Sequence, residues 1–300
     1  MCFPCHSRRQ PISDGAPPAR PLLENYVPQL IESGLYHPDG QIEAEDFEFG
    51  SFVQSRMYGA GVTCTNCHDA HTLKLKASGN ATCTQCHRAD FYDSATHHHH
   101  PRGSQAARCI SCPMPAKTYM GVDQRRDHSF RLPTPMLTVA TGAPNACNQC
   151  HADRTAAWAV AALKSWPTHD AAALHFAPAF DDAWSGSAAT AGLLQVFAQP
   201  LAPIVRGTAL SLLAAAPEPP PEPVSVALVK GVSDPNGLVR LGAARGIAGL
   251  APGAGLKTGA ALLADPLKAV RIEAARSLVG ADGASTPEPL RIDCIARHGN

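Results

Sequence analysis

The sequence predicts a mainly α-helical chain built from two unlike halves. Residues 1–151 are rich in cysteine, histidine, proline and glycine, which predicts a loop-rich domain with short helices. Residues 152–280 are rich in alanine and leucine in a repeating pattern, which predicts a stacked α-solenoid. Residues 281–300 lose this pattern and are expected to form an irregular tail. A chain of 300 residues is long enough for two ordinary domains.

Cysteine spacing is the strongest chemical signal in the first half. Ten of the eleven cysteines form Cys-x-x-Cys pairs, and four of the five pairs are followed directly by histidine. Covalent haem attachment uses this pattern, because two thiols bind the porphyrin and the next residue turns its imidazole onto the iron. A zinc ribbon is the alternative for the second and third pairs, which are fifteen residues apart, but it gives the fixed histidine no role. The predicted haem attachment residues are Cys2, Cys5, Cys64, Cys67, Cys83, Cys86, Cys147 and Cys150, with His6, His68, His87 and His151 as proximal ligands.

The fifth pair, Cys109 and Cys112, is followed by Pro113 instead of histidine. Proline offers iron no side-chain ligand, and it is expected to keep Cys112 out of the helical backbone region. Three outcomes stay open: an attached haem with an open coordination position, a site without haem, or a disulfide between the two cysteines. We therefore expect four haem c groups, and we interpret the fifth site as an impaired haem site rather than a catalytic one.

Seven histidines of the first half lie outside the motifs and supply candidate second ligands for the irons. Ligation by two histidines makes iron six-coordinate, and it predicts such an excess of histidine. His71 follows His68 too closely to reach the same iron from its other face, so it would serve a neighbouring iron. One or two histidines of the run 97–100 are expected to bind iron, and an ordinary surface role is the alternative for isolated histidines. The candidates are His37, His71, His98 and His128.

Residues 61–150 contain too few large apolar side chains to form an ordinary core. They include only ten valine, isoleucine, leucine and phenylalanine residues, well below the roughly 20% under which a chain is suspected of disorder. Large apolar porphyrins would supply the missing core and offset the entropy lost on folding. Each haem also brings two propionates, for which Arg125, Arg126 and Arg131 are candidate partners; a solvated basic loop is the alternative.

Three segments of the second half align, at 202–213, 236–247 and 267–278. Each contains a Val-Arg pair, and the pairs are spaced by 34 and then 31 residues. Shorter apolar stretches lie between them, so each repeat has two helices, as in HEAT repeats. A plain helical bundle is the alternative. Residues 152–166 are expected to form a first helix that docks on this solenoid.

Charge and hydropathy exclude other classes of function. Lysine plus arginine equals aspartate plus glutamate, 25 of each, so the chain lacks the basic footprint of a nucleic-acid-binding protein. No apolar run reaches the length of about 18 residues that a transmembrane helix needs. A Cys-x-x-Cys pair begins at residue 2 and leaves no room for a signal peptide, and no polar capping helix follows residue 280. We therefore expect the chain to be a fragment of a longer protein.

The stretches GVTCTNCHDAHTLKL, CISCPMPAKTYMGVDQRRDHSF and PNACNQCHAD resemble periplasmic multihaem cytochromes c with a doubled Cys-x-x-Cys-His motif, related to cytochrome c554 and pentahaem nitrite reductase. The resemblance covers residues 1–151, and some relatives continue into helical repeats. It implies a periplasmic electron carrier whose repeats dock a redox partner protein. The alternative is an oxidoreductase acting on a small nitrogen or sulfur oxyanion at an open haem iron. The nitrite reductases have lysine in place of the motif histidine, and no Cys-x-x-Cys-Lys occurs here, which favours the electron carrier.

Overall fold

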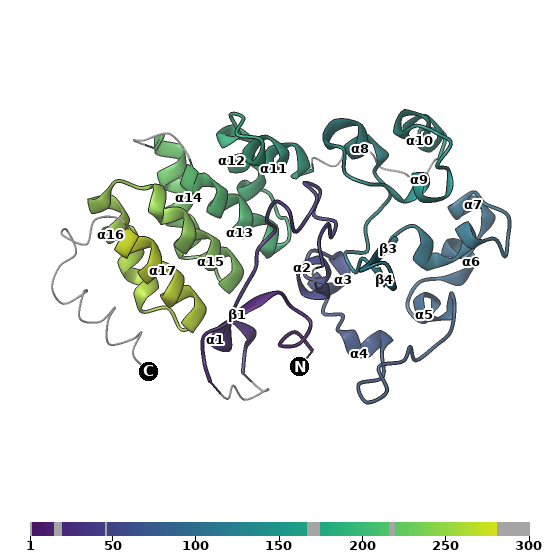
Figure 1. Cartoon of the computed structure of the whole chain (residues 1–300), viewed down its shortest axis with the longest axis horizontal. Helices are drawn as coiled ribbons and strands as arrows, with labels where there is room; N and C mark the ends of the chain where they lie inside the picture. Colours follow the sequence, from purple (N-terminus) through teal and green to yellow (C-terminus); the bar gives the residue numbers. More distant parts are fainter. Residues whose placement is uncertain (1, 15–19, 46, 167–174, 216–219, 281–300) are drawn as a thin grey trace. The chain divides into compact units, whose positions relative to one another are not determined.

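The computed structural model describes residues 2–14, 20–45, 47–166, 175–215 and 220–280 (Figure 1). The described chain is mainly helical, as predicted, and it divides into two compact units. One, here called the repeat unit, joins residues 1–34 to the chain from residue 176 onward; the other, here called the motif unit, spans residues 35–175. The predicted tail, 281–300, lies outside the described residues.

The two units do not follow the predicted boundary at residue 151. The first Cys-x-x-Cys-His motif belongs to the repeat unit, because residues 1–34 pack with the C-terminal helices. The helix expected over 152–166 forms as α10 (Ala156–Leu163) and belongs to the motif unit, and its docking on the repeats stays a prediction. It packs against α8 (Pro135–Thr141) and α9 (Ala146–Cys150), where Leu137, Ala159 and Leu163 are buried.

The repeat unit consists of an N-terminal hairpin followed by seven α-helices among its described residues. The hairpin pairs two short antiparallel strands, and a short helix precedes the second of them. Its elements are β1 (Arg9–Pro11), α1 (Leu22–Asn25), β2 (Tyr26–Pro28), α11 (Ala177–Trp184), α12 (Thr190–Ala198), α13 (Pro203–Leu212), α14 (Glu222–Val232), α15 (Gly237–Gly246), α16 (Pro252–Leu263) and α17 (Lys268–Gly280), with 3-10 turns at Leu213–Ala215 and Ile247–Gly249.

The later helices stack in two layers, as Figure 1 shows in green and yellow. Helices α12, α14 and α16 contact one another in sequence and form the first layer. Helices α13, α15 and α17 form the second layer and coincide with the three aligned sequence segments. Each second-layer helix packs on the preceding first-layer helix, which is the arrangement expected of two-helix repeats. Their assignment to the HEAT family stays a prediction.

The repeated arginines link one repeat to the next. Arg206 pairs with Asp234 at 2.9 Å, and Arg240 pairs with Asp265 at 2.6 Å. The Arg240 and Asp265 side chains are only 13% and 3% exposed, so this pair is largely removed from water. The close approach of α13 and α15 depends on Gly242, because a Cβ there would overlap the carbonyl oxygen of Gly207. These contacts explain why the Val-Arg pattern recurs in the sequence.

The motif unit has short helices joined by long loops and one small hairpin among its described residues. Two four-residue strands pair in antiparallel register, Ala116 opposite Arg126. Its elements are α2 (Glu48–Phe52), α3 (Arg56–Gly59), α4 (Cys64–Cys67), α5 (Ala81–Thr84), α6 (Ala89–Tyr92), α7 (Ala95–His98), β3 (Ala116–Tyr119), β4 (Asp123–Arg126), α8, α9 and α10, with 3-10 turns at Gln105–Ala107 and Cys109–Ser111.

Apolar burial differs sharply between the units. The repeat unit buries large side chains such as Ile204, Leu228 and Leu241 almost completely. In the motif unit, Leu73 and Val122 are 69% and 87% exposed, and Phe91 is exposed as well. The shortage of core side chains read from the sequence is therefore a property of the folded motif unit. Within the described residues, no helix combines the length and apolar composition that crossing a membrane requires.

Candidate functional site

The four Cys-x-x-Cys-His motifs share one backbone turn. In each, the N–H of the histidine donates to the carbonyl of the first cysteine four residues earlier, which closes a single helical turn. The N···O distances are 3.0 Å for His6 to Cys2, 2.8 Å for His68 to Cys64, 3.0 Å for His87 to Cys83 and 2.9 Å for His151 to Cys147. The spacing Cys-x-x-Cys-His thus fixes the two thiols and the histidine on one compact turn.

The fifth pair cannot close this turn, because Pro113 has no N–H to donate to Cys109. The segment Cys109–Ser111 forms a 3-10 turn instead, and the next backbone bond runs from Met114 N to Ile110 O at 3.2 Å. The expectation that proline keeps Cys112 out of the helical region is wrong, since its φ and ψ are −95° and −52°. The segment around Arg131 helps to hold this turn in place, because the backbone N–H of Arg131 donates to Pro113 O at 3.2 Å.

The three arginines expected near haem propionates are held by protein groups. Arg126 Nη1 donates to Met114 O at 2.8 Å and braces the turn after Cys112. Arg131 donates to Asp39 O and, at 2.6 Å, to Gln54 Oε1. Arg125 pairs with Asp123 at 2.7 Å. The polar contacts given for these arginines therefore support the motif unit itself, and a role toward propionates stays a prediction.

His68 and His128 face each other across a gap. Their ring centroids are 6.5 Å apart and the rings are inclined by 37°. Two imidazoles that bind one ion through Nε2 at about 2 Å each, the usual metal–imidazole distance, have ring centroids about 6 Å apart. The separation of the two rings is therefore compatible with ligation of a single metal ion by both histidines.

Backbone carbonyls orient both imidazoles of this pair. His68 Nδ1 donates to Leu73 O at 3.1 Å, and His128 Nδ1 donates to Arg126 O at 2.9 Å. A carbonyl only accepts hydrogen bonds, so Nδ1 carries a proton in both rings, and in a neutral ring this leaves the lone pair on Nε2. This is the arrangement typical of metal-bound histidine. Burial also lowers the pKa of His128, which favours the neutral form that a metal requires.

His100 and His151 form a second facing pair, with ring centroids 6.2 Å apart and an inclination of 32°. His100 Nδ1 donates to the backbone carbonyl of His98, which again leaves Nε2 free. Within the run 97–100 the sequence singled out His98, but the structure places His100 opposite a motif histidine. His98 Nδ1 instead accepts from His100 N at 3.2 Å. His99 has a φ of 55°, and this left-handed residue ends α7 and redirects the chain at His100.

Of the other predicted ligands, His98 also lies near a second imidazole, since its ring centroid is 6.5 Å from that of His100 with an inclination of 35°. The His87 ring meets Tyr92 at 5.3 Å, and Tyr92 in turn meets His97 at 5.1 Å. His71 is exposed, in a loop where its N–H donates to Asp69. Burial lowers the pKa of His37, whose backbone N–H donates to Gln41 O at 2.8 Å. Ligation by His37, His71 and His98 stays a prediction.

The four cysteine pairs of the motif unit form a continuous series in the order of the sequence. Gln85 Nε2, between Cys83 and Cys86, donates to Asn66 O of the preceding pair at 3.3 Å. The Cys83 thiol is hydrogen-bonded to that of Cys109, and Asn80 Oδ1 accepts from Cys109 N at 2.9 Å. The pair with Pro113 thus follows directly on the pair at 83 and 86.

The series continues to the last motif. Burial raises the pKa of Cys112 to about 11, and the nearby thiols of Cys147 and Cys150 add to this shift. Burial likewise raises the pKa of Cys83 to about 11, so the free thiols of Cys83 and Cys112 are largely protonated near neutral pH. The Cys109–Cys112 pair lies between two intact motifs, with one on either side.

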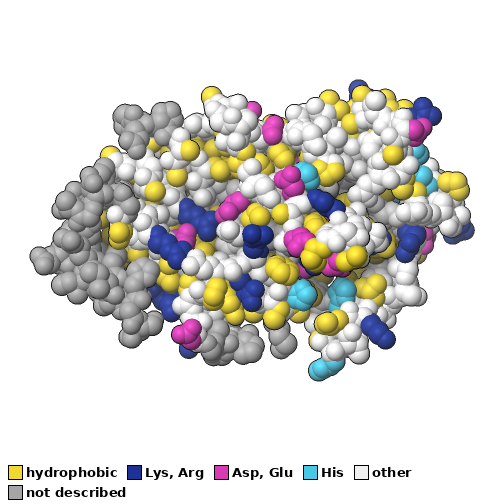
Figure 2. Space-filling view, viewed as in Figure 1, with side chains coloured by type: hydrophobic (Ala, Val, Ile, Leu, Met, Phe, Trp, Pro, Cys, Tyr) yellow, Lys and Arg dark blue, Asp and Glu magenta, His cyan; other side chains and the backbone are white. Residues whose placement is uncertain are grey.

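The motif unit fits large apolar prosthetic groups better than zinc. Its exposed apolar side chains include Leu75, Phe91 and Tyr92, which are close to the second and third motifs in the sequence. Figure 2 shows in yellow where hydrophobic side chains reach one face of the molecule. His97 Nδ1 and His98 Nε2 are buried without a hydrogen-bond partner. In the described part of the chain, no three His, Cys, Asp or Glu side chains gather into a metal cluster, so the four cysteines of the zinc alternative do not form one site.

Comparison with known proteins matches a segment in which cysteine spacing had predicted haem attachment. A family model described as a doubled CXXCH motif matches residues 58–91, which contain the second and third motifs. No curated protein and no solved structure matches the chain. The match covers a small part of the chain, and it supports covalent haem binding of the c type at these motifs.

Proposed function

We propose that this chain is a multihaem c-type cytochrome that carries electrons in the periplasm. Four haem c groups would be attached at the Cys-x-x-Cys-His motifs, and redox partner proteins would donate and accept the electrons. The observation that carries the proposal is the proximity of two imidazole pairs, His68 with His128 and His100 with His151, whose ring separations are compatible with ligation of one ion by each pair.

The two imidazole pairs favour electron transfer over catalysis. Each pair supplies one motif histidine and one histidine from elsewhere in the motif unit, so both axial positions of an iron would be filled. A haem bound in this way supplies one-electron oxidation and reduction at its iron. An iron without an open position has no place for a substrate, which is what metal-centred catalysis needs. The oxyanion-reducing alternative has no such support at these two sites.

The continuous series of cysteine pairs supports passage of electrons along the motif unit. Successive pairs lie near one another, through a Gln85–Asn66 hydrogen bond, a Cys83–Cys109 thiol hydrogen bond and the influence of Cys147 and Cys150 on the pKa of Cys112. Prosthetic groups attached to adjacent pairs would lie close together. The Cys109–Cys112 pair lies within this series, so a site without haem there would separate the third motif from the last.

Ligand substitution in the full-length protein tests the proposal. The purified protein should carry covalent haem by mass, with low-spin spectra and several low-potential reduction steps that need no substrate. His128→Ala and His100→Ala should each convert one haem to a high-spin form that binds carbon monoxide. His99→Ala is the matched control, because its ring stacks on Trp166 at 4.3 Å and faces no motif histidine.

Two results would contradict the proposal. A mature protein without covalent haem would exclude a c-type cytochrome. Low-spin spectra that survive both His128→Ala and His100→Ala would show that other residues bind the irons.

A further inference from the structure

The N-terminal segment, here called the arm (residues 7–14 and 20–33), lies on the second layer of the repeat unit. It follows directly after the first haem-binding motif, at residues 2–6, and both belong to the same compact unit. Hydrogen bonds and ion pairs join it to all three second-layer helices, α13, α15 and α17. In repeat proteins, the surface of such a layer is usually open to binding partners.

The arm completes the N-terminus of α17. Glu24 Oε1 accepts from the backbone N–H of Lys268, the first residue of that helix, at 3.0 Å. A carboxylate at this position satisfies an N–H that has no partner within the helix and interacts favourably with the helix dipole. The Lys268 side chain reaches back to Ser13 Oγ at 3.1 Å. Two separate parts of the arm therefore bind the same helix end.

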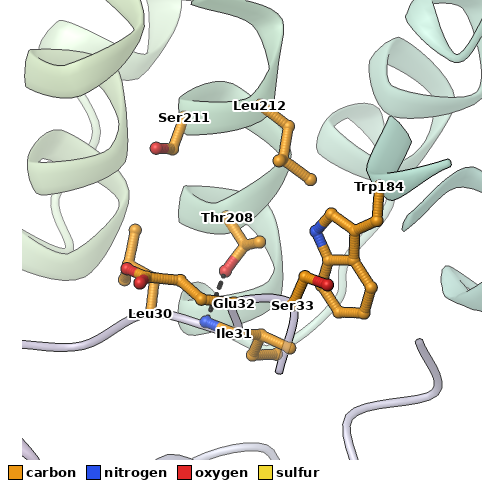
Figure 3. A pocket seen from close by; sticks show the side chains of 8 residues that line it. All are labelled: Leu30, Ile31, Glu32, Ser33, Trp184, Thr208, Ser211 and Leu212. Atoms are coloured by element: carbon orange, nitrogen blue, oxygen red, sulfur yellow. Dashed lines mark hydrogen bonds between the residues drawn. The ribbon is translucent and has the colours of Figure 1, made fainter. Parts of the chain in front are cut away.

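Contacts with α15 and α13 fix the other end of the arm. Arg245 pairs with Glu32 at 3.0 Å while it also pairs with Glu273 at 2.8 Å inside the repeats. Ile31 N donates to Thr208 Oγ1 at 3.1 Å in a fully buried hydrogen bond. Figure 3 shows this bond where the arm crosses α13.

The arm is packed as core rather than as a loose strand. Leu30 and Ile31 are 1% and 0% exposed, and Val27 and Asn25 are buried too. Beside the crossing, Trp184 and Leu212 of the helices and Ser33 of the arm line a pocket of about 240 Å³. Burial of apolar side chains on this scale stabilises the arm by several times the thermal energy.

We propose that the second layer of the repeats is the docking site for the chain's own first haem-binding segment. The group attached at Cys2 and Cys5 would then be carried by the repeat unit, to which residues 1–34 belong. The identity of that group rests on the proposed function, whereas the docking of the arm does not. A redox partner that binds the repeats must then use other surfaces, such as the first layer, where Val226 and Val229 of α14 are exposed.

A cleavage experiment on the folded full-length protein tests this assignment. One site for a specific protease is inserted after Gly34 and a second within residues 167–174. After cleavage in native buffer, size-exclusion chromatography with mass analysis shows which fragment retains residues 1–34. We expect the N-terminal fragment to co-elute with the fragment that contains α11 to α17, and to carry one covalent haem.

Two variants separate the docking contacts from general stability. Glu24→Ala combined with Glu32→Ala removes both arm carboxylates and should release the N-terminal fragment about tenfold faster, since hydrogen bonds to charged groups contribute most strongly. Arg206→Ala is the matched control, because it removes an ion pair with Asp234 inside the repeats. It should leave the release rate of the arm unchanged.

The outcomes test the docking of the arm and the attachment of a haem at the first motif separately. An N-terminal fragment that elutes alone, or with residues 35–166, overturns the docking proposal. A fragment that co-elutes with the repeats but carries no haem supports docking and contradicts the haem at this motif. If the three fragments stay together, the rate of amide hydrogen exchange in residues 20–33 shows whether Glu24 and Glu32 hold the arm on the repeats. Faster exchange only in the Glu24→Ala/Glu32→Ala variant supports the proposal, and unchanged exchange in both variants overturns it.

Discussion

Replacing Pro113 by histidine should convert the damaged fifth site into a haem-binding motif. The substitution restores the imidazole and the N–H that donates to the first cysteine in the other four motifs, at 2.8 to 3.0 Å. Cys112 already has helical backbone angles, so the turn can close without a large change in the chain. It also removes the clash by which proline disfavours these angles in the preceding residue.

The expected change in haem content follows from the number of motifs, and the expected effect of the backbone follows from one hydrogen bond. Haem absorbance per mole of protein should rise by one quarter, from four groups to five. The restored hydrogen bond itself contributes only about 1 kcal/mol, so the backbone alone should not change attachment. Pro113→Ala is the matched control, because it restores the N–H without an imidazole and should retain four haems.

The assay is the mass of the intact protein combined with absorbance of the denatured, reduced haem. Alkylation supplies a second count, since four attached haems leave Cys109, Cys112 and Cys294 free to react after reduction, and five leave Cys294 alone. Five haems in the unsubstituted protein would refute the idea that Pro113 blocks attachment. Four haems in Pro113→His would refute the idea that proline is what impairs the site.

Two further predictions concern stability. Arg240→Ala should lower the free energy of unfolding of the repeat unit by about 3 kcal/mol, because it leaves the buried Asp265 carboxylate without its ion-pair partner. Denaturant unfolding followed by circular dichroism measures this change. Arg88→Ala removes an exposed ion pair and should leave the free energy of unfolding unchanged, and equal effects of the two substitutions would contradict the reasoning. Chain expressed without haem attachment should be cut by protease within residues 58–166 while residues 176–280 resist, because the latter bury many more large apolar side chains. Equal resistance of both parts would show that the motif unit folds without prosthetic groups.

Local sequence patterns predicted the repeated helices but not the packing of the arm against them. Helices α13, α15 and α17 arise where the Val-Arg segments recur, because helical periodicity and the Arg–Asp contacts repeat with the sequence. The return of the arm to these helices depends on contacts such as Glu24 with Lys268, which leave no periodic signal. The packing of α10 against α8 and α9 also went unpredicted, since its alanine-rich sequence suits either unit.

The candidate site also has one part that the sequence predicted and one part that it did not. The motifs are local, so spacing alone located the thiols and the first histidine of each turn. The second histidine of each facing pair is set by distant backbone, as with His128 opposite His68. Composition cannot separate four consecutive histidines, and only the left-handed backbone at His99 brings His100 to face His151.

The contact between Glu24 and Lys268 also bears on how the chain reaches its folded state, because it joins residues 244 positions apart. Contacts between such distant positions form slowly, since a long loop must close before they are made. Synthesis proceeds from the N-terminus, so the arm exists well before the helices that receive it. The arm therefore spends an interval undocked, during which the neighbouring thiols of Cys2 and Cys5 are not yet next to a completed repeat unit.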